Sequence, residues 1–296
     1  MLLEFRDITK SFGEKTVLSG VSLSAEGGRA FGLLGRNGAG KTTAIRILMG
    51  VFPADSGEIL LDGRPINRRQ IGLGYLPEER GLYPKKPILD QLVYFAELYG
   101  MKRRDATLAV DAWLERLGMS EYRTRRLDTL SKGNQQKIQL VTALAHDPDI
   151  VILDEPFSGL DPVNAMLLKD VVREEIAKGK IVLFSSHQMS YIEEFCDSIA
   201  ILNAGRIVLS GDLAAIRDSY PADRLTVRAP EPGPLLAAFG DACTPLGDGR
   251  LLLRLRDEGE RFSVMRRLTE EFRIDEVGVL RPSLSDIFVE YTREQV

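Results

Sequence analysis

The residues whose types and spacing point most clearly to chemistry form a glycine-rich loop, Gly35-Arg36-Asn37-Gly38-Ala39-Gly40-Lys41-Thr42-Thr43. The loop fits the pattern G-x-x-x-x-G-K-[ST], in which backbone N–H groups bind the phosphates of a nucleotide. We expect its three glycines to take positive φ and to let the backbone approach a polyphosphate closely. Lys41 would neutralise the β- and γ-phosphates, and the Thr42 hydroxyl would bind Mg²⁺. The loop therefore predicts a nucleotide-binding site.

The segments on either side of the loop have the character that this pattern requires. The apolar run 30–34 predicts a buried strand before the loop, and the amphipathic run 44–49 predicts a helix after it. Because the N-terminus of a helix carries partial positive charge, this arrangement favours an anion at the loop. A chance match in a glycine-rich turn is the alternative, and the flanking strand and helix argue against it.

Two adjacent acids, Asp154 and Glu155, follow a second apolar strand at 150–153. Side chains alternate along a strand, so the two carboxylates should leave it in opposite directions. Asp154 can contribute to a Mg²⁺ site, as the second acid of phosphate-loop enzymes does. Glu155 is then free to polarise an attacking water. Taken alone, such a pair is usually a solvated strand end, but the phosphate loop upstream favours a catalytic pair.

With these two motifs, residues 1–220 resemble an ATP-binding cassette (ABC) ATPase. A third motif, Leu130-Ser131-Lys132-Gly133-Asn134-Gln135-Gln136, resembles the family's signature L-S-G-G-Q, with Lys132 and Asn134 as departures. In the family, this segment reaches across a head-to-tail dimer to the γ-phosphate bound by the other subunit. Its donors and its helix N-terminus suit an anion. An ordinary helix start is the alternative interpretation.

Single positions elsewhere match the family. His187, after the predicted strand 181–184, resembles the switch histidine that contacts the γ-phosphate and orients water. Asp161, in Ser158-Gly159-Leu160-Asp161, resembles the segment that lines the dimer interface. Phe12 resembles the aromatic residue that stacks on adenine, with a core phenylalanine as the alternative. His146 is expected only to cap the C-terminus of a helix.

One position departs from the family in a way that affects the metal. After Gly74-Tyr75-Leu76-Pro77 the family usually has a glutamine that touches Mg²⁺, and this chain has Glu78. A carboxylate is a better ligand than an amide for a hard cation. It also adds negative charge beside the γ-phosphate. In the family the glutamine moves with the membrane partner, so the coupling of hydrolysis to that partner can differ here.

The resemblance implies a complete set of site residues, with ATP and Mg²⁺ as the bound species. The expected catalytic residues are Glu155, His187 and Lys41, and the expected Mg²⁺ ligands are Thr42, Glu78 and Asp154. The expected nucleotide-binding residues are Phe12, Gly35, Arg36, Asn37, Gly38, Ala39, Gly40, Lys41, Thr42, Thr43, Ser131, Gly133, Asn134 and Asp161.

The order of the predicted elements indicates an α/β fold with two domains. Strands are expected at 3–8, 17–23, 30–34, 58–61, 70–76, 150–153, 181–184, 198–202 and 206–209, with helices at 163–177 and 212–219. Three apolar faces at helical spacing lie within 87–148. We therefore expect an ABC-type phosphate-loop core at 1–220, with a β-subdomain and a helical subdomain at about 87–148.

Residues 221–296 should form a small α+β domain. Its expected strands are 225–229, 251–255 and 274–280, and its expected helices are 262–272 and 284–291. A Pro-rich connection is expected at 230–234.

Composition narrows the function classes. The chain has 296 residues, 44% of them hydrophobic, and a formal net charge of −4. This charge gives no basic field for nucleic acid. The two cysteines, Cys196 and Cys243, fit a reducing compartment. No signal peptide and no apolar run of the ~20 residues needed to span a membrane is evident. We expect a cytoplasmic chain attached peripherally to the inner face of the membrane.

The resemblance implies an ATPase that drives separate transmembrane permease subunits by ATP-dependent dimerisation, as a homodimer or with a related ATPase. The stretch from Leu76 to Pro84 and the C-terminal unit resemble an export-type branch that includes sodium-extrusion systems. Tyr83, Tyr94, Phe95 and Tyr99 are candidates for a permease-docking groove, although a role in the internal core is expected for most of them.

Two other functions stay open at this point. One is a non-transport ABC ATPase that acts on the ribosome or nucleic acid; the single cassette, without a heptad run or basic tail, argues against it. The other is a cassette that binds ATP without hydrolysing it. Lys41, Asp154, Glu155 and His187 argue against this second alternative.

Overall fold

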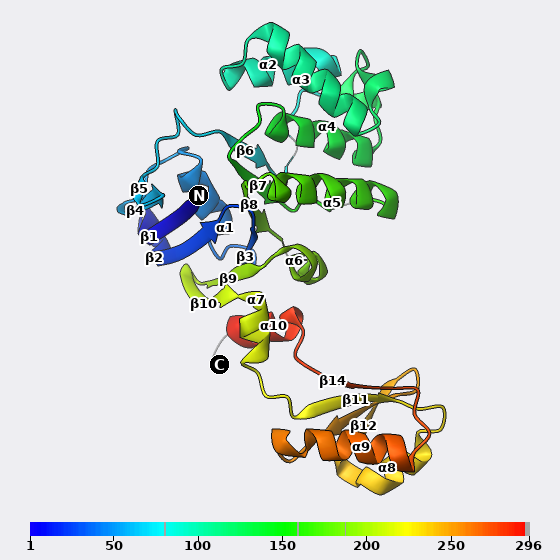
Figure 1. Ribbon diagram of the computed structural model, residues 1–296. Helices are drawn as coiled ribbons and strands as arrows, with labels where there is room; N and C mark the ends of the chain where they lie inside the picture. The colour runs from blue at the N-terminus through cyan, green and yellow to red at the C-terminus, as the bar shows by residue number, and fades with distance from the viewer. Residues whose placement is uncertain (80, 159, 187, 294–296) are drawn as a thin grey trace. The chain divides into compact units, whose positions relative to one another are not determined.

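The computed structural model describes residues 1–79, 81–158, 160–186 and 188–293. It divides into two compact units (Figure 1). The first contains Met1–Leu213 together with the C-terminal segment that begins at Phe288, and the second is Ala214–Ile287. The sequence boundary at residue 220 thus differs by a few residues from this division, and it stays a prediction.

An antiparallel sheet begins the first unit. Its strand order is β2-β1-β4-β5, with β1 at Leu2–Phe12, β2 at Lys15–Glu26, β4 at Ser56–Leu61 and β5 at Arg64–Pro65. Apolar and polar residues alternate along β1 and β2, so that one face is buried. This sheet corresponds to the expected β-subdomain.

The main sheet of this unit has the order β10-β9-β3-β8-β7-β6. Its strands are β3 (Ala30–Leu34), β6 (Leu73–Leu76), β7 (Ile150–Asp154), β8 (Ile181–Ser185), β9 (Ser198–Asn203) and β10 (Arg206–Asp212). All pairs are parallel except β9 with β10. Every residue of β3, β7 and β8 is buried, as expected for strands covered on both faces. Because these strands are parallel, the segments after β3, β6, β7 and β8 leave the sheet at one edge.

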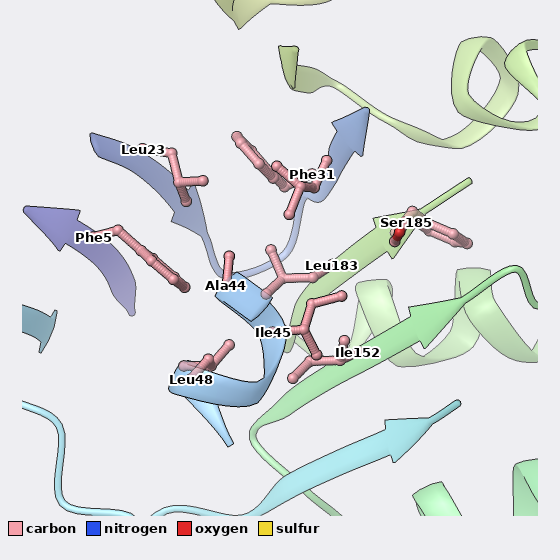
Figure 2. Close-up of a pocket in the computed structure, with 11 residues that line it drawn as sticks. Phe5, Leu23, Phe31, Ala44, Ile45, Leu48, Ile152, Leu183 and Ser185 are labelled. Atoms are coloured by element: carbon pink, nitrogen blue, oxygen red, sulfur yellow. The ribbon is translucent and has the colours of Figure 1, made fainter. Parts of the chain in front are cut away.

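Helix α1 (Lys41–Leu48) lies between the two sheets (Figure 2). Its buried face, Ala44, Ile45 and Leu48, lines a small apolar cavity. Phe5 and Leu23 reach this cavity from the antiparallel sheet, and Phe31, Ile152 and Leu183 reach it from the main sheet. The helix that follows the phosphate loop is therefore fixed by the core on two sides.

The insert between β6 and β7 is helical, as predicted. It contains α2 (Ile88–Leu98), α3 (Arg103–Arg116), two short 3₁₀ turns (Ser120–Tyr122 and Leu127–Thr129) and α4 (Lys132–Leu144). Helix α2 packs on α3 and α4, and α4 packs on β6. Helices α5 (Pro162–Ala177), α6 (Met189–Phe195) and α7 (Leu213–Asp218) follow further along the chain. Helix α6 was not anticipated from the sequence.

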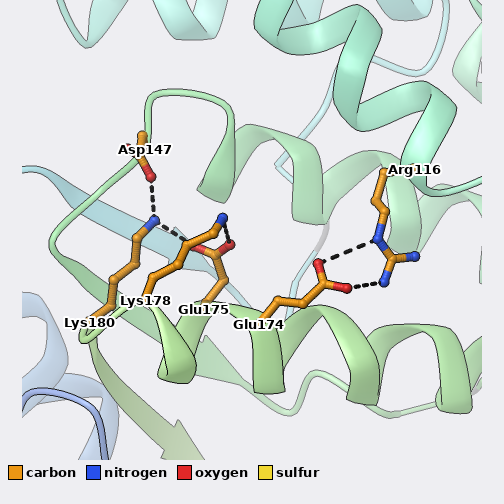
Figure 3. A network of polar contacts seen from close by, with 6 residues as sticks. All are labelled: Arg116, Asp147, Glu174, Glu175, Lys178 and Lys180. Carbon is orange, nitrogen blue, oxygen red and sulfur yellow. Dashed lines mark hydrogen bonds and ion pairs between the residues drawn. The ribbon is translucent and has the colours of Figure 1, made fainter.

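Ion pairs around the buried carboxylate of Glu175 hold the C-terminal end of α5 (Figure 3). Glu175 accepts from both Lys178 and Lys180, and Lys180 also contacts Asp147 just beyond α4. Burial alone would lower the pKa of Lys180, but its bonds to Asp147 and Glu175 raise it. The preceding residue, Glu174, pairs with Arg116 of α3 at the surface. These contacts join α5 to the helical insert and to the start of β8.

The second unit is an α+β fold, as predicted. Its sheet has the order β12-β13-β11-β14, with β11 at Arg224–Arg228, β12 at Cys243–Gly247, β13 at Arg250–Arg254 and β14 at Glu276–Val279. Helices α8 (Gly233–Phe239) and α9 (Arg261–Glu271) contribute Leu235 and Leu268 to its core. The last helix, α10 (Leu284–Thr292), begins in this unit and ends in the first.

Candidate nucleotide site

The loop between β3 and α1 has the expected backbone at two of its three glycines. Gly38 has φ of 81° and Gly40 has φ of 114°, values that favour glycine. Gly35 does not take positive φ, so that part of the prediction is wrong. A Cβ at Gly35 would lie 2.5 Å from the carbonyl oxygen of Leu202 on β9. Glycine is needed there because a neighbouring strand passes so close to the backbone.

Lys41 lies at the start of α1, with its ammonium group turned back over the loop. Its Nζ donates to the carbonyl of Gly35 at 2.6 Å and to that of Arg36 at 3.4 Å. Burial lowers the pKa of Lys41, while the carboxylates of Asp154, Glu155 and Glu78 act in the opposite direction. The first N–H groups of a helix, here those of residues 41–43, have no partner within the helix. The loop thus combines a cation with backbone donors, which suits a phosphate.

Asp154 and Glu155 stand at the end of β7, and both are buried. Glu155 has φ of 49°, which is uncommon for a residue other than glycine and common at functional sites. Its N–H donates to the carbonyl of Ser185 at 2.8 Å, and the Ser186 hydroxyl donates to its Oε2 at 2.9 Å. The N–H of Gln188 in turn donates to the Ser186 hydroxyl at 3.0 Å. Ser186, which the sequence did not single out, therefore orients the Glu155 carboxylate.

The electrostatics around Asp154 favour a bound cation. Burial raises the pKa of Asp154, and the carboxylates of Glu78 and Glu155 add to this effect, while Lys41 lowers the pKa. The Tyr75 hydroxyl donates to Oδ2 of Asp154 at 3.4 Å, and burial together with this carboxylate raises the pKa of Tyr75 to about 12. Tyr75 is a second contact that was missed, because only the pairing of β6 with β7 makes it visible.

A metal site made of protein side chains alone is not present in the described ranges: no group of three or more His, Cys, Asp or Glu residues could hold an ion there. Mg²⁺ usually takes one or two carboxylates and completes its shell with phosphate oxygens and water. Buried Asp154, beside two further carboxylates, fits such a site because a cation relieves their mutual repulsion. The roles of Thr42, Glu78 and Asp154 as ligands stay predictions.

The signature segment begins helix α4, and Asp161 begins α5. The Ser131 hydroxyl caps α4 by accepting from the N–H of Asn134 at 3.3 Å. Asp161 caps α5 by accepting from the N–H groups of Val163 and Asn164, each at 3.0 Å, and the bond from Asn164 contributes most to its lowered pKa. A Cβ on Gly133 would lie 3.0 Å from Nδ2 of Asn164. The two helix N-termini are therefore neighbours, which brings Ser131, Gly133 and Asp161 into one region.

Phe12 lies on the surface at the end of β1, with 50% of its area exposed. Its ring meets that of Phe52 edge-on at 5.4 Å between centroids, and Nζ of Lys10 lies 5.5 Å from its centroid. This exposure argues against the alternative of a core phenylalanine. An exposed ring is available for stacking on a base, and this role stays a prediction.

The structure tests the prediction made for His146 but not the one made for His187. His187 lies outside the described residues, as does Gly159 of the interface motif, so their predicted roles are untested. His146 does not cap its own helix, contrary to expectation. Its Nε2 bonds to the carbonyl of Leu73 on β6 at 3.1 Å, and its ring stacks on Tyr99 at 3.7 Å between centroids. Burial lowers the pKa of His146.

Aromatic side chains of the helical insert are more exposed than expected. Tyr83, Tyr94 and Tyr99 each keep about half of their area accessible, so the expectation of an internal core is wrong for these three. Phe95 packs between Tyr83 and Tyr94, with centroid distances of 6.2 Å and 5.7 Å. Among the described helices, none is long and apolar enough to cross a membrane.

Comparisons with known proteins agree with this geometry. A family model described as "ABC transporter" matches residues 18–158, and one described as "ATP-binding protein DrrA1-3-like, C-terminal domain" matches residues 211–292. The chain is 40% identical over 292 residues to the uncharacterized ABC transporter ATP-binding protein YhaQ of Bacillus subtilis (strain 168), covering 98% of each chain.

Two further matches support the same assignment. The chain is 35% identical over 249 residues to the Nod factor export ATP-binding protein I of Paraburkholderia xenovorans (strain LB400), covering 82% of this chain and 81% of the relative. A solved structure of an ATP-binding subunit of an ABC transporter matches with a TM-score of 0.67 at 32% identity, over 74% of this chain and 92% of that chain. These findings confirm the resemblance inferred from the motifs. The chain belongs to the ATP-binding proteins of ABC transporters, with a DrrA-like C-terminal domain.

Proposed function

We propose that this protein hydrolyses ATP to drive an ABC exporter, and that Glu155 positions the attacking water. One observation carries the proposal: Glu155 is buried and held by Ser186 at the sheet edge where the phosphate loop also lies. An oriented carboxylate beside a phosphate site can polarise water for attack on the γ-phosphorus.

ATP would bind through its phosphates to the backbone N–H groups of residues 35–43. Lys41 would move its ammonium group from the carbonyl of Gly35 to the β- and γ-phosphates, where the charge is greater. Phe12 would stack on adenine. Thr42, Asp154 and Glu78 would hold Mg²⁺, which neutralises phosphate charge when bound.

Hydrolysis would follow from positioning and charge stabilisation. Glu155 orients the water, and Lys41 and His187 stabilise the charge on the transferring phosphoryl group. Ser131 of the partner subunit contacts the same phosphate, assisted by the positive end of its helix α4. Loss of this contact after hydrolysis would let two cassettes separate. Each pair contains two copies, or one copy with a related cassette.

Closing and separation of the two cassettes would drive transmembrane permease subunits. The cassettes would lie at the inner face of the cell membrane, attached to these subunits. Two features support export: the DrrA-like C-terminal domain, and similarity to a relative named for Nod factor export. The exposed Tyr83, Tyr94 and Tyr99 are candidates for the permease contact. Co-purification of the tagged chain with a multispan membrane protein would support this partner, whereas co-purification with ribosomes or nucleic acid would contradict it.

The Glu155→Gln variant tests the proposed chemistry. Loss of an oriented general base typically costs ~10²–10⁴-fold in rate, so hydrolysis should fall by at least ~100-fold. ATP affinity should stay within about twofold, because the phosphate loop is unchanged. Ser186→Ala, which removes a single bond to Glu155, should cause a smaller loss. Steady-state phosphate release and equilibrium ATP binding measure both quantities; undiminished turnover in Glu155→Gln would exclude Glu155 as the base.

A further inference from the structure

A buried glutamine on α4 holds the backbone on both sides of Glu78. Gln139 is 2% exposed, and its Nε2 donates to the carbonyl of Pro77 at 3.0 Å and to that of Glu79 at 3.2 Å. The two protons of the amide are therefore shared between the carbonyls of the two residues on either side of Glu78. Glu78 itself is exposed, so these contacts act on its backbone.

Loss of this contact would release the backbone beside Glu78. The carbonyls of the half-buried Pro77 and the exposed Glu79 would lose their donor, and each is destabilised unless water or another group replaces the bond. Without the amide of Gln139, the segment after β6 would have to find new donors or move towards water. A change in its backbone would move the Glu78 carboxylate, which acts electrostatically on both Lys41 and Asp154.

Helix α4 also contacts the backbone next to Glu155. Gln136, three residues before Gln139 and therefore on the same face of α4, donates through Nε2 to the carbonyl of Pro156 at 3.2 Å. Pro156 directly follows Glu155. The N-terminus of this helix is capped by Ser131 of the signature segment. One rigid element thus connects the signature segment to the backbone beside each acid.

We propose that Gln139 is a positioning residue, which sets the place of the Glu78 carboxylate at the Mg²⁺–ATP site relative to the signature helix. Gln139 acts through the carbonyls of Pro77 and Glu79, not by contact with the nucleotide. This inference rests on the proposed metal role of Glu78, and the two can fail separately in the experiment below.

The test compares Gln139→Leu with a matched control, Gln91→Leu. Gln91, on α2, is 3% exposed, and its amide also bonds to loop backbone. Its Oε1 accepts from the N–H of Tyr83 at 3.0 Å, and its Nε2 donates to the carbonyl of Lys86 at 3.3 Å. Both changes remove a buried amide of the same type and a similar loss of stability is expected. Only Gln139 touches the residues beside Glu78.

We expect Gln139→Leu to raise the Mg²⁺ concentration for half-maximal ATP hydrolysis by about fivefold to tenfold. ATP binding, measured calorimetrically in the Glu155→Gln background, should weaken by a similar factor with Mg²⁺ and stay unchanged with EDTA.

Hydrogen exchange should rise in peptides covering 73–82 for Gln139→Leu, and in peptides covering 83–91 for Gln91→Leu. The Gln91→Leu variant should keep the Mg²⁺ dependence of the unchanged protein. Gln139→Glu, of nearly the same shape but without donors when ionised, replaces Gln139→Leu if that variant does not fold.

A double variant separates the inference from the metal role. If Gln139 acts through Glu78, adding Gln139→Leu to Glu78→Ala should change the Mg²⁺ dependence by less than about twofold. Additive shifts, or equal shifts in Gln139→Leu and Gln91→Leu, would overturn the inference while the metal role of Glu78 stands. An unchanged Mg²⁺ dependence in Glu78→Ala would overturn the metal role and, with it, the inference.

Discussion

At the scale of single residues, Gly35 is required by packing, whereas Gly38 and Gly40 are required by their backbone conformation. The carbonyl oxygen of Leu202 occupies the space where a side chain at position 35 would begin. The phosphate-loop pattern states only that glycine stands there. The structure adds that β9 lies against the start of the loop and fixes its position.

We predict that Gly35→Ala lowers the free energy of unfolding by about 1–3 kcal/mol, because the added methyl group has to displace strand β9. Thermal and urea unfolding measure this change. Gly233→Ala is the control, since an added Cβ there would have no other part of the described chain within 4 Å beyond its own neighbours and helix backbone, and Gly233 has an ordinary φ. A loss of stability no larger for Gly35→Ala than for Gly233→Ala would contradict the packing argument.

Residue types and spacing were enough to predict which charged groups make up the candidate nucleotide site. The loop, Asp154 and Glu155 are local patterns, so a linear sequence contains them in full. Ser186, Tyr75 and Gln139 could not be found in this way. Each acts on a residue from a distant part of the chain, and only the pairing of β7 with β8 and β6, and the packing of α4 on β6, creates the contact.

At the scale of elements, two neighbouring acids of α5 differ in what they hold. Glu175 is 1% exposed and pairs with Lys178 and Lys180, whereas Glu174 pairs with Arg116 on the surface (Figure 3). Removing one partner of a buried pair leaves an uncompensated charge, while an exposed pair is screened by water.

We therefore predict that Glu175→Ala lowers the free energy of unfolding by about 3–5 kcal/mol, because Lys180 would lose its buried partner and keep its contact with the exposed Asp147. Glu174→Ala, one residue away on the same helix, should cost less than about 1 kcal/mol. Urea unfolding followed by circular dichroism compares the two variants. Equal losses would show that the burial of Glu175 does not determine its contribution.

The elements that the sequence predicted best are those with an unbroken apolar pattern. Strand β3 has the predicted bounds, and β7 and β8 extend the predicted ranges by one residue. Helix α8 and strand β12 were missed because proline masks their pattern. Pro234 lies in the first turn of α8, where its lack of an N–H is tolerated, and Pro245 lies in β12, which is at the edge of its sheet.

At the scale of the whole molecule, the chain consists of two units that share its last helix. Residues after Ile287 return to the first unit, where the Asn203 amide donates to the carbonyl of Tyr291 at 3.2 Å. The sequence could predict two domains from composition and pattern. It could not predict this return, because α10 carries no sign of which unit its second half contacts. We propose that the C-terminal unit steadies the dimer or regulates turnover.

The proposed function requires that two cassettes close on ATP and separate when it is hydrolysed. Light scattering of the Glu155→Gln variant with ATP and Mg²⁺ tests it most directly, because a blocked base should trap the closed pair. We expect the molar mass of two chains with ATP and Mg²⁺, and that of one chain in EDTA or with ADP. The mass of a single chain with ATP bound, both alone and mixed with any cassette that co-purifies, would contradict it.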